Sequence, residues 1–184
     1  MASAFGHLAV AYAMGKTLNP SWPTQRFWVL TVLCCLLPDV DVLGLMLGVP
    51  YEHALGHRGI THSIAFAILV GIMVPKLAVP AIPCWSRRYG VLVIYFGLVT
   101  MSHGLLDAFT DGGLGIAFFA PFDATRYFFP WRPIAVSPIG ISEFVSLGGL
   151  RVLLIEGIWI GIPVTFWLMV QWIRRRRGTV EGAC

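Results

Sequence analysis

The segment from residue 149 to residue 173 constrains the possible fold more than any other part of the chain. It is apolar apart from Arg151, Glu156 and Gln171. A helix of about 20 such residues, rising about 1.5 Å per residue, crosses a bilayer core of ~30 Å. Residues 63–83 and 89–106 are also almost entirely apolar and long enough to cross. We therefore expect a polytopic membrane protein.

The composition agrees with a membrane location. Only 12% of the residues are charged and the mean hydropathy is +0.77, whereas a soluble domain carries about 25% charged residues. We find no internal repeat and no flexible linker, so residues 1–184 are expected to form a single membrane-embedded domain. The four cysteines contain no CxxC pair, which argues against a zinc site built from thiolates.

A fourth apolar segment, residues 27–48, is interrupted in its middle by Pro38, Asp39 and Asp41. A proline and two carboxylates would be costly in a lipid-facing helix. We expect the helix to break there and to direct its end into a protein-lined cavity. Residues 4–18 form a helix too short to span alone. The predicted fold class is all-α, with about four spanning or broken helices plus this short N-terminal helix.

Residues 108–148 differ from the rest of the chain because they are rich in glycine, proline and aromatic residues. They predict an irregular flap at the outer membrane–water interface, where aromatic side chains are favoured. Arg126 and Arg132 lie within this flap, and we predict that they bind substrate. The alternative is a plain interfacial loop without a binding role.

Basic residues predict the orientation of the chain. Cytoplasmic loops are enriched in lysine and arginine, and the helices alternate consistently if three basic groups are cytoplasmic: Lys16 with Arg26, Arg87 with Arg88, and residues 174–177. The C-terminus is then cytoplasmic. The terminal arginine run directly follows an apolar helix, which indicates a membrane anchor, so we expect no nucleic-acid partner. The histidines and aspartates of four separate elements then fall together at outward-facing ends.

These outward-facing residues are the candidate metal ligands. His103 and Asp107 are four residues apart and share one face of a helix, although a buried histidine paired with a carboxylate has the same spacing. Imidazole and carboxylate ligands without sulfur suit zinc first, with manganese or iron as alternatives. We predict one or two ions, and which of the two neighbouring aspartates is a ligand stays open. The predicted metal ligands are His7, Asp39, Asp41, His62, His103 and Asp107.

The stretch GHRGITHS, residues 56–63, adds two candidate catalytic residues. His57 is predicted to act as a general acid or base. Arg58 is predicted to neutralise phosphate charge, because a guanidinium matches phosphate oxygens in a fork; the alternative is an arginine that reaches the membrane interface. Thr61 is predicted to cap the following helix.

The motifs LLPDVD, GHRGITHS and HGLLDAFTDGG, followed by an aromatic segment, resemble the YdjM-like family. Its members are bacterial inner-membrane proteins described as metal-dependent hydrolases, some of them regulated by LexA. The resemblance covers most of residues 1–132. The family is in turn distantly similar to the zinc-dependent phospholipase C and fungal nuclease superfamily. That similarity implies a helical fold with His7, Asp39 or Asp41, His62, and His103 with Asp107 as ligands. No histidine follows His103, so a third metal is not expected.

We therefore predict a membrane-bound, metal-dependent hydrolase of the inner membrane with its site facing outward. The leading function is a phospholipase-like phosphoesterase acting on a lipid or another membrane-associated phosphoester through a metal-activated water. One alternative is hydrolysis of an ester or amide at the same metal site. Another is a non-catalytic protein that binds or transports metal. The oligomeric state stays open.

Overall fold

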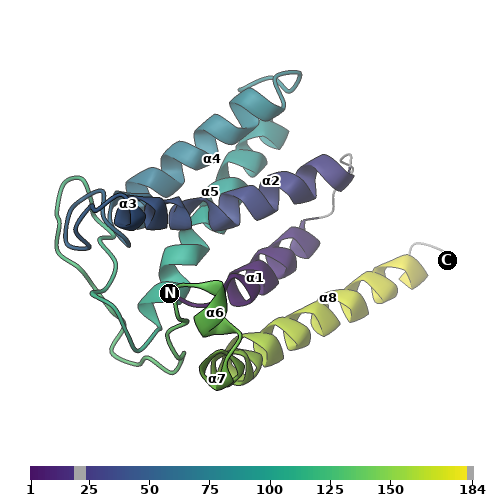
Figure 1. The fold of residues 1–184 in the computed structure, drawn as a ribbon. Helices are drawn as coiled ribbons and strands as arrows, with labels where there is room; N and C mark the ends of the chain where they lie inside the picture. Colours follow the sequence, from purple (N-terminus) through teal and green to yellow (C-terminus); the bar gives the residue numbers. More distant parts are fainter. Residues whose placement is uncertain (19–23, 182–184) are drawn as a thin grey trace.

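The computed structural model describes residues 1–18 and 24–181, and within them it is all-helical, as the sequence predicted (Figure 1). The flap adds two isolated β-bridges, Thr110 with Ile134 and Ile116 with Tyr127. The α-helices are α1 (Ala4–Thr17), α2 (Thr24–Leu36), α3 (Val42–Met46), α4 (Ile64–Ala78), α5 (Arg87–Ala108), α6 (Ile141–Phe144), α7 (Leu147–Glu156) and α8 (Ile162–Glu181). Two 3₁₀ segments, η1 (Leu37–Asp41) and η2 (Ile60–His62), and one π-helical turn, η3 (Gly157–Gly161), complete the elements of the described residues.

Among the described residues, three helical stretches are long and apolar enough to cross a membrane: Gln25–Met46, Arg87–Ala108 and Leu147–Arg176. The span expected at residues 63–83 is shorter than predicted, because α4 has 15 residues and ends at Ala78. Val79 leaves the helical conformation, and Pro80 and Pro83 follow it closely. Proline removes the backbone donor that continuation of the helix would need.

The break predicted at Pro38 is present as a change of helix type, because the chain stays helical from Gln25 to Met46. The α2 helix ends at Leu36, and residues 37–41 tighten into the 3₁₀ segment η1 with Pro38 in its first turn. A 3₁₀ helix has 3.0 residues per turn, whereas an α-helix has 3.6. The side chains after Pro38 are therefore rotated about the helix axis relative to those of α2. Asp41 is thereby buried, whereas the next helix, α3, buries none of its own residues.

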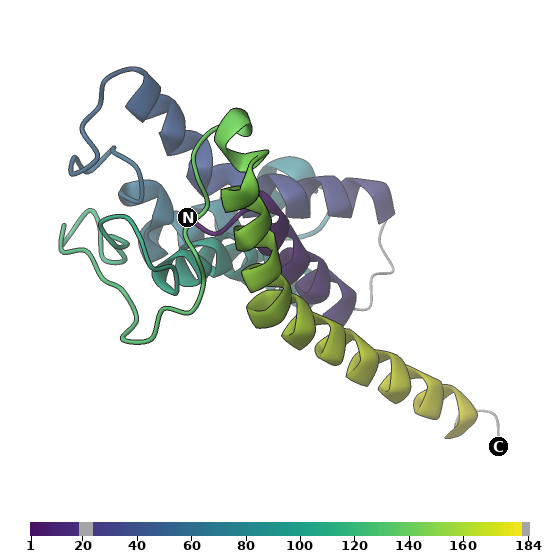
Figure 2. The same ribbon diagram turned by 60° about the horizontal axis from the view of Figure 1, so that its bottom comes forward.

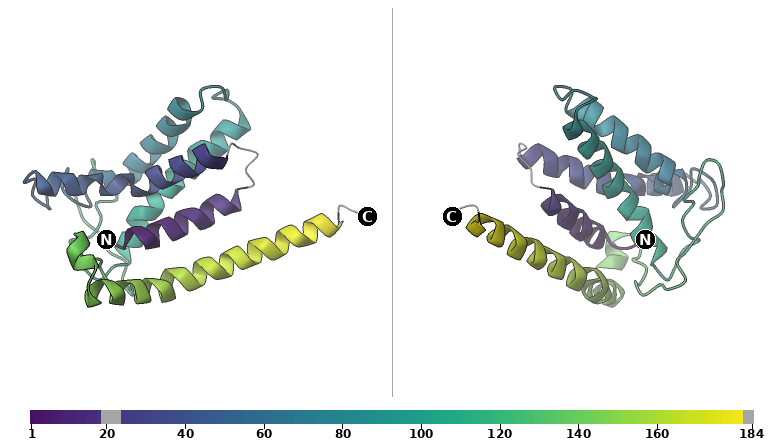
Figure 3. Two further views of the ribbon diagram at one scale, coloured as in Figure 1. Left: turned by 45° about the vertical axis from the view of Figure 1, so that its right-hand side comes forward. Right: turned by 180° about the vertical axis from the view of Figure 1, so that it is seen from behind.

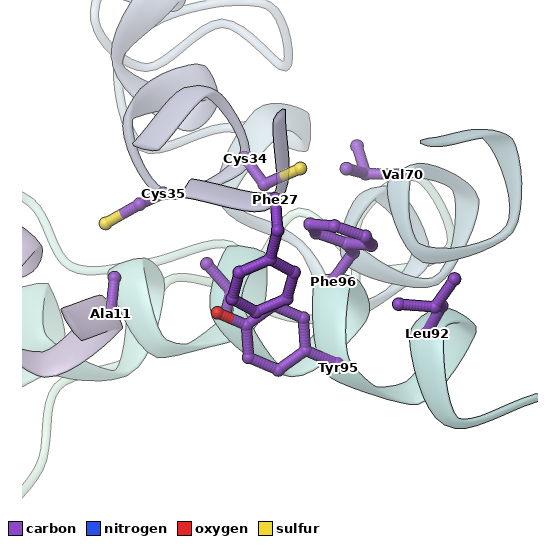
Figure 4. Close-up of a cluster of buried hydrophobic side chains, with 9 residues drawn as sticks. Ala11, Phe27, Cys34, Cys35, Val70, Leu92, Tyr95 and Phe96 are labelled. Carbon is purple, nitrogen blue, oxygen red and sulfur yellow. The ribbon is translucent and has the colours of Figure 1, made fainter. Parts of the chain in front are cut away.

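The bundle is built around a hairpin of α4 and α5. Their backbones approach closely at Gly71, where a Cβ atom would lie 2.6 Å from the Val93 carbonyl oxygen and 2.9 Å from Gly97 Cα. Small residues at such contacts let membrane helices pack closely. Phe27 of α2 stacks on Tyr95 of α5 with a ring separation of 5.0 Å, at the centre of the buried apolar cluster (Figure 4).

The α8 helix is arranged differently from the hairpin. It runs along α1 and then extends beyond it as a long arm towards the C-terminus (Figures 2 and 3). The π-helical turn η3 separates α7 from α8. At the opposite end of the bundle, the N-terminus lies beside α6 and the flap (Figure 1). Chain segments that are distant in sequence therefore meet at one end of the molecule.

Candidate metal centre

Four elements bring the predicted ligands together at this end of the bundle. His7 comes from the first turns of α1, and Asp39 comes from the 3₁₀ segment η1. His62 ends η2 immediately before α4, while His103 and Asp107 share one face of the last turns of α5. The predicted convergence of these elements is therefore present in the structure.

Four of these residues form the tightest group. Asp39, His62, His103 and Asp107 each offer one ligand atom, and these atoms all lie within 4.8 Å of one another. His103 Nε2 lies 3.2 Å and His62 Nε2 3.7 Å from the same atom, Asp39 Oδ1. His62 Nε2 is also 3.8 Å from Asp107 Oδ2. Ligand atoms placed tetrahedrally about 2.0 Å from zinc are about 3.3 Å apart, so these separations suit a metal site.

Hydrogen bonds on the far side of each ring fix the histidine tautomers. His103 Nδ1 lies 2.8 Å from the carbonyl oxygen of Cys35, which can only accept, so Nδ1 carries the proton. His62 Nδ1 lies 3.1 Å from Asp41 Oδ2. A neutral ring with its proton on Nδ1 presents the lone pair of Nε2 towards Asp39. Metal-binding histidines are typically held in this way, with the second ring nitrogen donating to a carboxylate or carbonyl.

The strongest sign of a cation site is a set of buried polar atoms that make no hydrogen bond. Buried polar atoms nearly always have a hydrogen-bond partner. Within the part of the chain that the structure describes, the buried side-chain atoms without such a partner all belong to this site. They are His7 Nδ1 and Nε2, Asp39 Oδ1, Arg58 Nε, His62 Nε2, His103 Nε2 and Asp107 Oδ2.

The charge of the site also suits a divalent cation. Three carboxylates, Asp39, Asp41 and Asp107, face one guanidinium, Arg58, so neutral imidazoles leave an excess of two negative charges. Buried charge without compensation is strongly unfavourable. A single divalent metal ion would neutralise this excess.

Asp107 is held on both of its oxygens. Oδ1 accepts a hydrogen bond from the Ala2 backbone N–H at 2.6 Å and lies 3.3 Å from His7 Nε2. Oδ2 lies 3.2 Å from Arg58 Nε. The His7 ring also stacks on His103, with ring centres 3.7 Å apart. His7 is thus adjacent to the group of four without belonging to it.

Asp41 lies behind His62 and is engaged by hydrogen bonds. Oδ1 is 2.7 Å from His57 Nδ1, and Oδ2 accepts from the Arg58 N–H at 3.0 Å and from the Thr61 hydroxyl at 2.7 Å. Asp41, His57 and His62 also form a second geometric group of possible ligands. Because Asp41 already has several donors, this geometry fits a residue that orients His62 better than one that binds metal directly.

Thr61 does not cap α4, contrary to the prediction. Its hydroxyl donates to Asp41, and Ser63 caps the helix by accepting a hydrogen bond from the Phe66 N–H at 3.1 Å. Ser63 has the extended conformation typical of a capping residue. Thr61 is consequently part of the polar network around the site.

Arg58 is completely buried, with 0% exposure, and each guanidinium nitrogen faces a protein group. Besides Asp107, its partners are the Gly112 carbonyl oxygen at 2.7 Å and the Thr110 hydroxyl at 2.9 Å. Its φ of 62° lies in the left-handed region, which costs a non-glycine residue about 1–3 kcal/mol. These contacts suit a residue that fixes Asp107 and the start of the flap more than one that contacts substrate.

The two predicted substrate-binding arginines have different surroundings. Arg126 is half-buried and donates to the carbonyl oxygens of His57 at 3.0 Å and Tyr51 at 2.8 Å, so it ties the flap to the preceding loop. Arg132 is exposed, and its guanidinium lies 4.7 Å from the centre of the Phe128 ring. Neither arginine belongs to the group of possible ligands.

The structure adds contacts that sequence patterns did not indicate. The Ala2 N–H and the Cys35 carbonyl are backbone groups, for which side-chain motifs give no signal. Buried Glu156 accepts hydrogen bonds from both the backbone N–H and the hydroxyl of Ser3, which anchors the first residues beside Asp107. An intramembrane carboxylate is unusual in sequence, but its partner comes from the other end of the chain.

Comparison with known proteins shows the family of the chain. Residues 1–178 match the family model described as YdjM inner membrane protein. The chain belongs to the YdjM family. It is also similar to the inner membrane protein YbcI of Escherichia coli strain K12, with 34% identity over 177 residues, covering 96% of this chain and 100% of that protein. No solved structure matches the chain. Family membership establishes an inner membrane protein and names no reaction.

Proposed function

We propose that this YdjM-family protein is a metal-dependent hydrolase that cleaves a phosphoester of a membrane lipid. The supporting observation is the set of unsatisfied buried atoms that converges from α1, η1, η2 and α5. Without a ligand, most of these buried groups only face one another at 3.2 to 3.8 Å and make no hydrogen bond, which is unfavourable inside a membrane protein. A metal ion held by Asp39, His62, His103 and Asp107 would satisfy one atom of each.

The donor set suits zinc, with manganese and iron as alternatives, because it mixes imidazole and carboxylate without sulfur. When bound, such an ion lowers the pKa of a water molecule towards 7 and stabilises negative charge on phosphoryl oxygens. The remaining roles in the site belong to protein residues. His7 would support Asp107, whose Oδ1 lies 3.3 Å from His7 Nε2, and would add a ligand if a second ion binds.

The exposed edge of the site lies at Asp39. Its side chain is 16% exposed, whereas the side chains of His62, His103 and Asp107 are fully buried. Substrate and water would therefore approach from the Asp39 side. His57 is oriented by the carboxylate of Asp41 at 2.7 Å, an arrangement that suits a histidine transferring a proton. Arg132 is the exposed arginine of the flap, so its guanidinium is the more accessible of the two to a phosphate.

The test is hydrolysis by purified protein in mild detergent after loading with zinc. The substrate panel contains phospholipids, polyprenyl phosphates and carboxylic esters of matched chain length. We expect release of phosphate or headgroup by the wild-type protein and a loss of at least about 10²-fold in Asp39→Asn. Asp123→Asn is the matched control, because this carboxylate bonds Thr125 and Tyr127 within the flap.

Absence of activity on every phosphorylated substrate at full metal occupancy would refute the phosphoesterase. Cleavage of the carboxylic esters alone would move the chemistry to acyl hydrolysis at the same site.

The near-closed ligand set supports a second candidate function. Structural metal sites are closed, whereas catalytic sites keep a position open. Here three of the four ligand side chains are fully buried. A protein that only binds metal would retain it tightly and hydrolyse nothing. The same panel separates the candidates, since metal content and turnover are measured on one sample.

A further inference from the structure

Glu156 is a buried carboxylate outside the group of possible metal ligands. It is 4% exposed and lies within Leu147–Arg176, one of the candidate spans. Among the described residues it pairs with no lysine, arginine or histidine. A carboxylate within a membrane span is costly and usually has a function. An apolar side chain of similar volume would pack there at lower cost, so we looked for the role of this residue in its contacts.

Both carboxylate oxygens of Glu156 are engaged by Ser3. Oε1 accepts a hydrogen bond from the Ser3 backbone N–H, and Oε2 accepts one from the Ser3 hydroxyl. The same hydroxyl oxygen accepts from the Gly6 N–H at 3.3 Å, which makes Ser3 the N-cap of α1. The first N–H groups of a helix have no partner within the helix, and a capping residue fixes this turn. Glu156 therefore holds the cap of α1 in place.

The two helices approach each other closely at this contact. A Cβ atom at Gly6 would lie 2.9 Å from Ile160 Cδ1 and 3.1 Å from Glu156 Cδ. The π-helical turn η3 directly follows Glu156 and packs against α1 (Figure 2). π-helical turns within helices often accompany functional sites. The first turn of α1 is thus seated against the end of α7 with little space to shift.

The same turn of α1 contacts two members of the group of four. The Ala2 N–H, one residue before Ser3, donates to Asp107 Oδ1 at 2.6 Å. His7, one turn after Ser3, places Nε2 3.3 Å from the same oxygen and stacks its ring on His103 at 3.7 Å. The position of Ser3 consequently decides how α1 meets Asp107 and His103.

We propose that Glu156 is a positioning residue of the metal centre, which acts by holding Ser3 and so places the first turn of α1 against Asp107 and His103. The proposal rests on the proposed function for the bound metal, but metal binding can be measured without any reaction. Loss of a group that orients metal ligands typically lowers metal affinity by about 10- to 100-fold. We expect a loss of this size when the contact between Glu156 and Ser3 is removed.

The first experiment compares Glu156→Leu with the control Leu92→Ala. Leucine has a similar volume to glutamate and offers no acceptor to Ser3. Zinc affinity, measured on metal-free protein by competition with a chromophoric chelator, should fall by about 10- to 100-fold. Leu92 is 2% exposed on α5 and about 22 Å along the helix from Asp107. Leu92→Ala should lower the melting temperature and keep the wild-type zinc affinity. Wild-type affinity in Glu156→Leu, or an equal loss in Leu92→Ala, would overturn the proposal.

A conservative variant keeps the test decisive if Glu156→Leu does not fold. Glu156→Gln retains one acceptor for the Ser3 N–H but presents an amide donor to the hydroxyl, so its zinc affinity should fall by up to about tenfold. Ser3→Ala removes the hydroxyl and should have a similar effect. If Glu156 acts through Ser3, the loss in the double variant is smaller than the product of the two single losses. A loss equal to that product would contradict the proposal.

Hydrolysis by the same samples separates this proposal from the proposed function. If wild-type protein binds zinc and hydrolyses nothing, while zinc affinity still depends on Glu156, the proposed function fails and the positioning role stands. If wild-type protein hydrolyses a substrate and Glu156→Leu binds zinc as tightly, only the positioning role fails.

Discussion

Replacing Asp41 by asparagine tests how the candidate metal centre is organised. In the structure Oδ2 faces His62 Nδ1 and accepts from Arg58 and Thr61, while Oδ1 faces His57 Nδ1. An asparagine that keeps its carbonyl oxygen at the Oδ2 position retains three of these contacts. It loses the negative charge and presents an amide donor to His57. The fold should therefore survive, while His62 becomes a poorer ligand.

The expected size of this effect follows from the role of Asp41. Loss of a carboxylate that orients a metal-binding histidine lowers metal affinity by about 10- to 100-fold, or about 1.4 to 2.8 kcal/mol. Loss of a direct ligand should cost considerably more, so Asp107→Asn sets the lower limit of affinity. Asp123→Asn, which changes a flap carboxylate to the same side chain, sets the upper limit.

Competition with a chromophoric zinc chelator measures these affinities on metal-free protein in detergent. Asp41→Asn should fall between the two reference variants. An affinity equal to that of wild-type protein would refute the orienting role of Asp41. An affinity as low as that of Asp107→Asn would show that Asp41 is itself a ligand, which the sequence left open.

Three further predictions concern the fold and the topology. Gly71→Val should lower the melting temperature measured by scanning fluorimetry, because the valine side chain would meet the backbone of α5. Gly90→Val should leave it unchanged, because no atom lies within 4 Å of a Cβ atom built at Gly90. Equal melting temperatures of the two variants would contradict the packing of the hairpin. Arg58→Ala should destabilise the protein by about 3–5 kcal/mol, because it removes the guanidinium that is paired with the buried Asp107 carboxylate. Wild-type resistance to denaturant would show that this ion pair is not needed. In a single-cysteine background, a cysteine introduced at Ala124 of the flap should react with a membrane-impermeant reagent added to the outer side. Reaction only when the reagent is given access to the cytoplasmic side would reverse the predicted orientation.

Sequence reasoning succeeded where one residue type has one strong physical consequence. Pro38 lacks a backbone donor, so the broken helix could be predicted, and it forms the 3₁₀ segment η1. The four-residue spacing of His103 and Asp107 placed both on one face of α5. The positive-inside rule placed the other candidate ligands at the same depth in the membrane. The structure brings three of them, His7, Asp39 and His62, to the same end of the bundle.

The remaining features depend on partners that are distant in sequence. Arg58 was predicted to bind a phosphate through its guanidinium group. In the structure this group is buried and donates to Thr110 and Gly112 of the flap. Asp39 and Asp41 look alike in sequence, yet the 3₁₀ turn directs one towards His103 and the other towards His57. Hydrophobic patterns carry no information on such tertiary pairs. The end of α4 was misplaced because residues 79–83 are apolar outside the helix.

The most direct test of the account is the metal content of the purified protein. Wild-type protein isolated in mild detergent without added chelator should contain about one equivalent of a divalent transition metal per chain by inductively coupled plasma mass spectrometry, and at most about two. His62→Ala and Asp107→Asn should remove most of it, because each takes away a ligand from the group of four. Folded wild-type protein that contains no transition metal and takes up none from added zinc, manganese or iron would contradict the central claim.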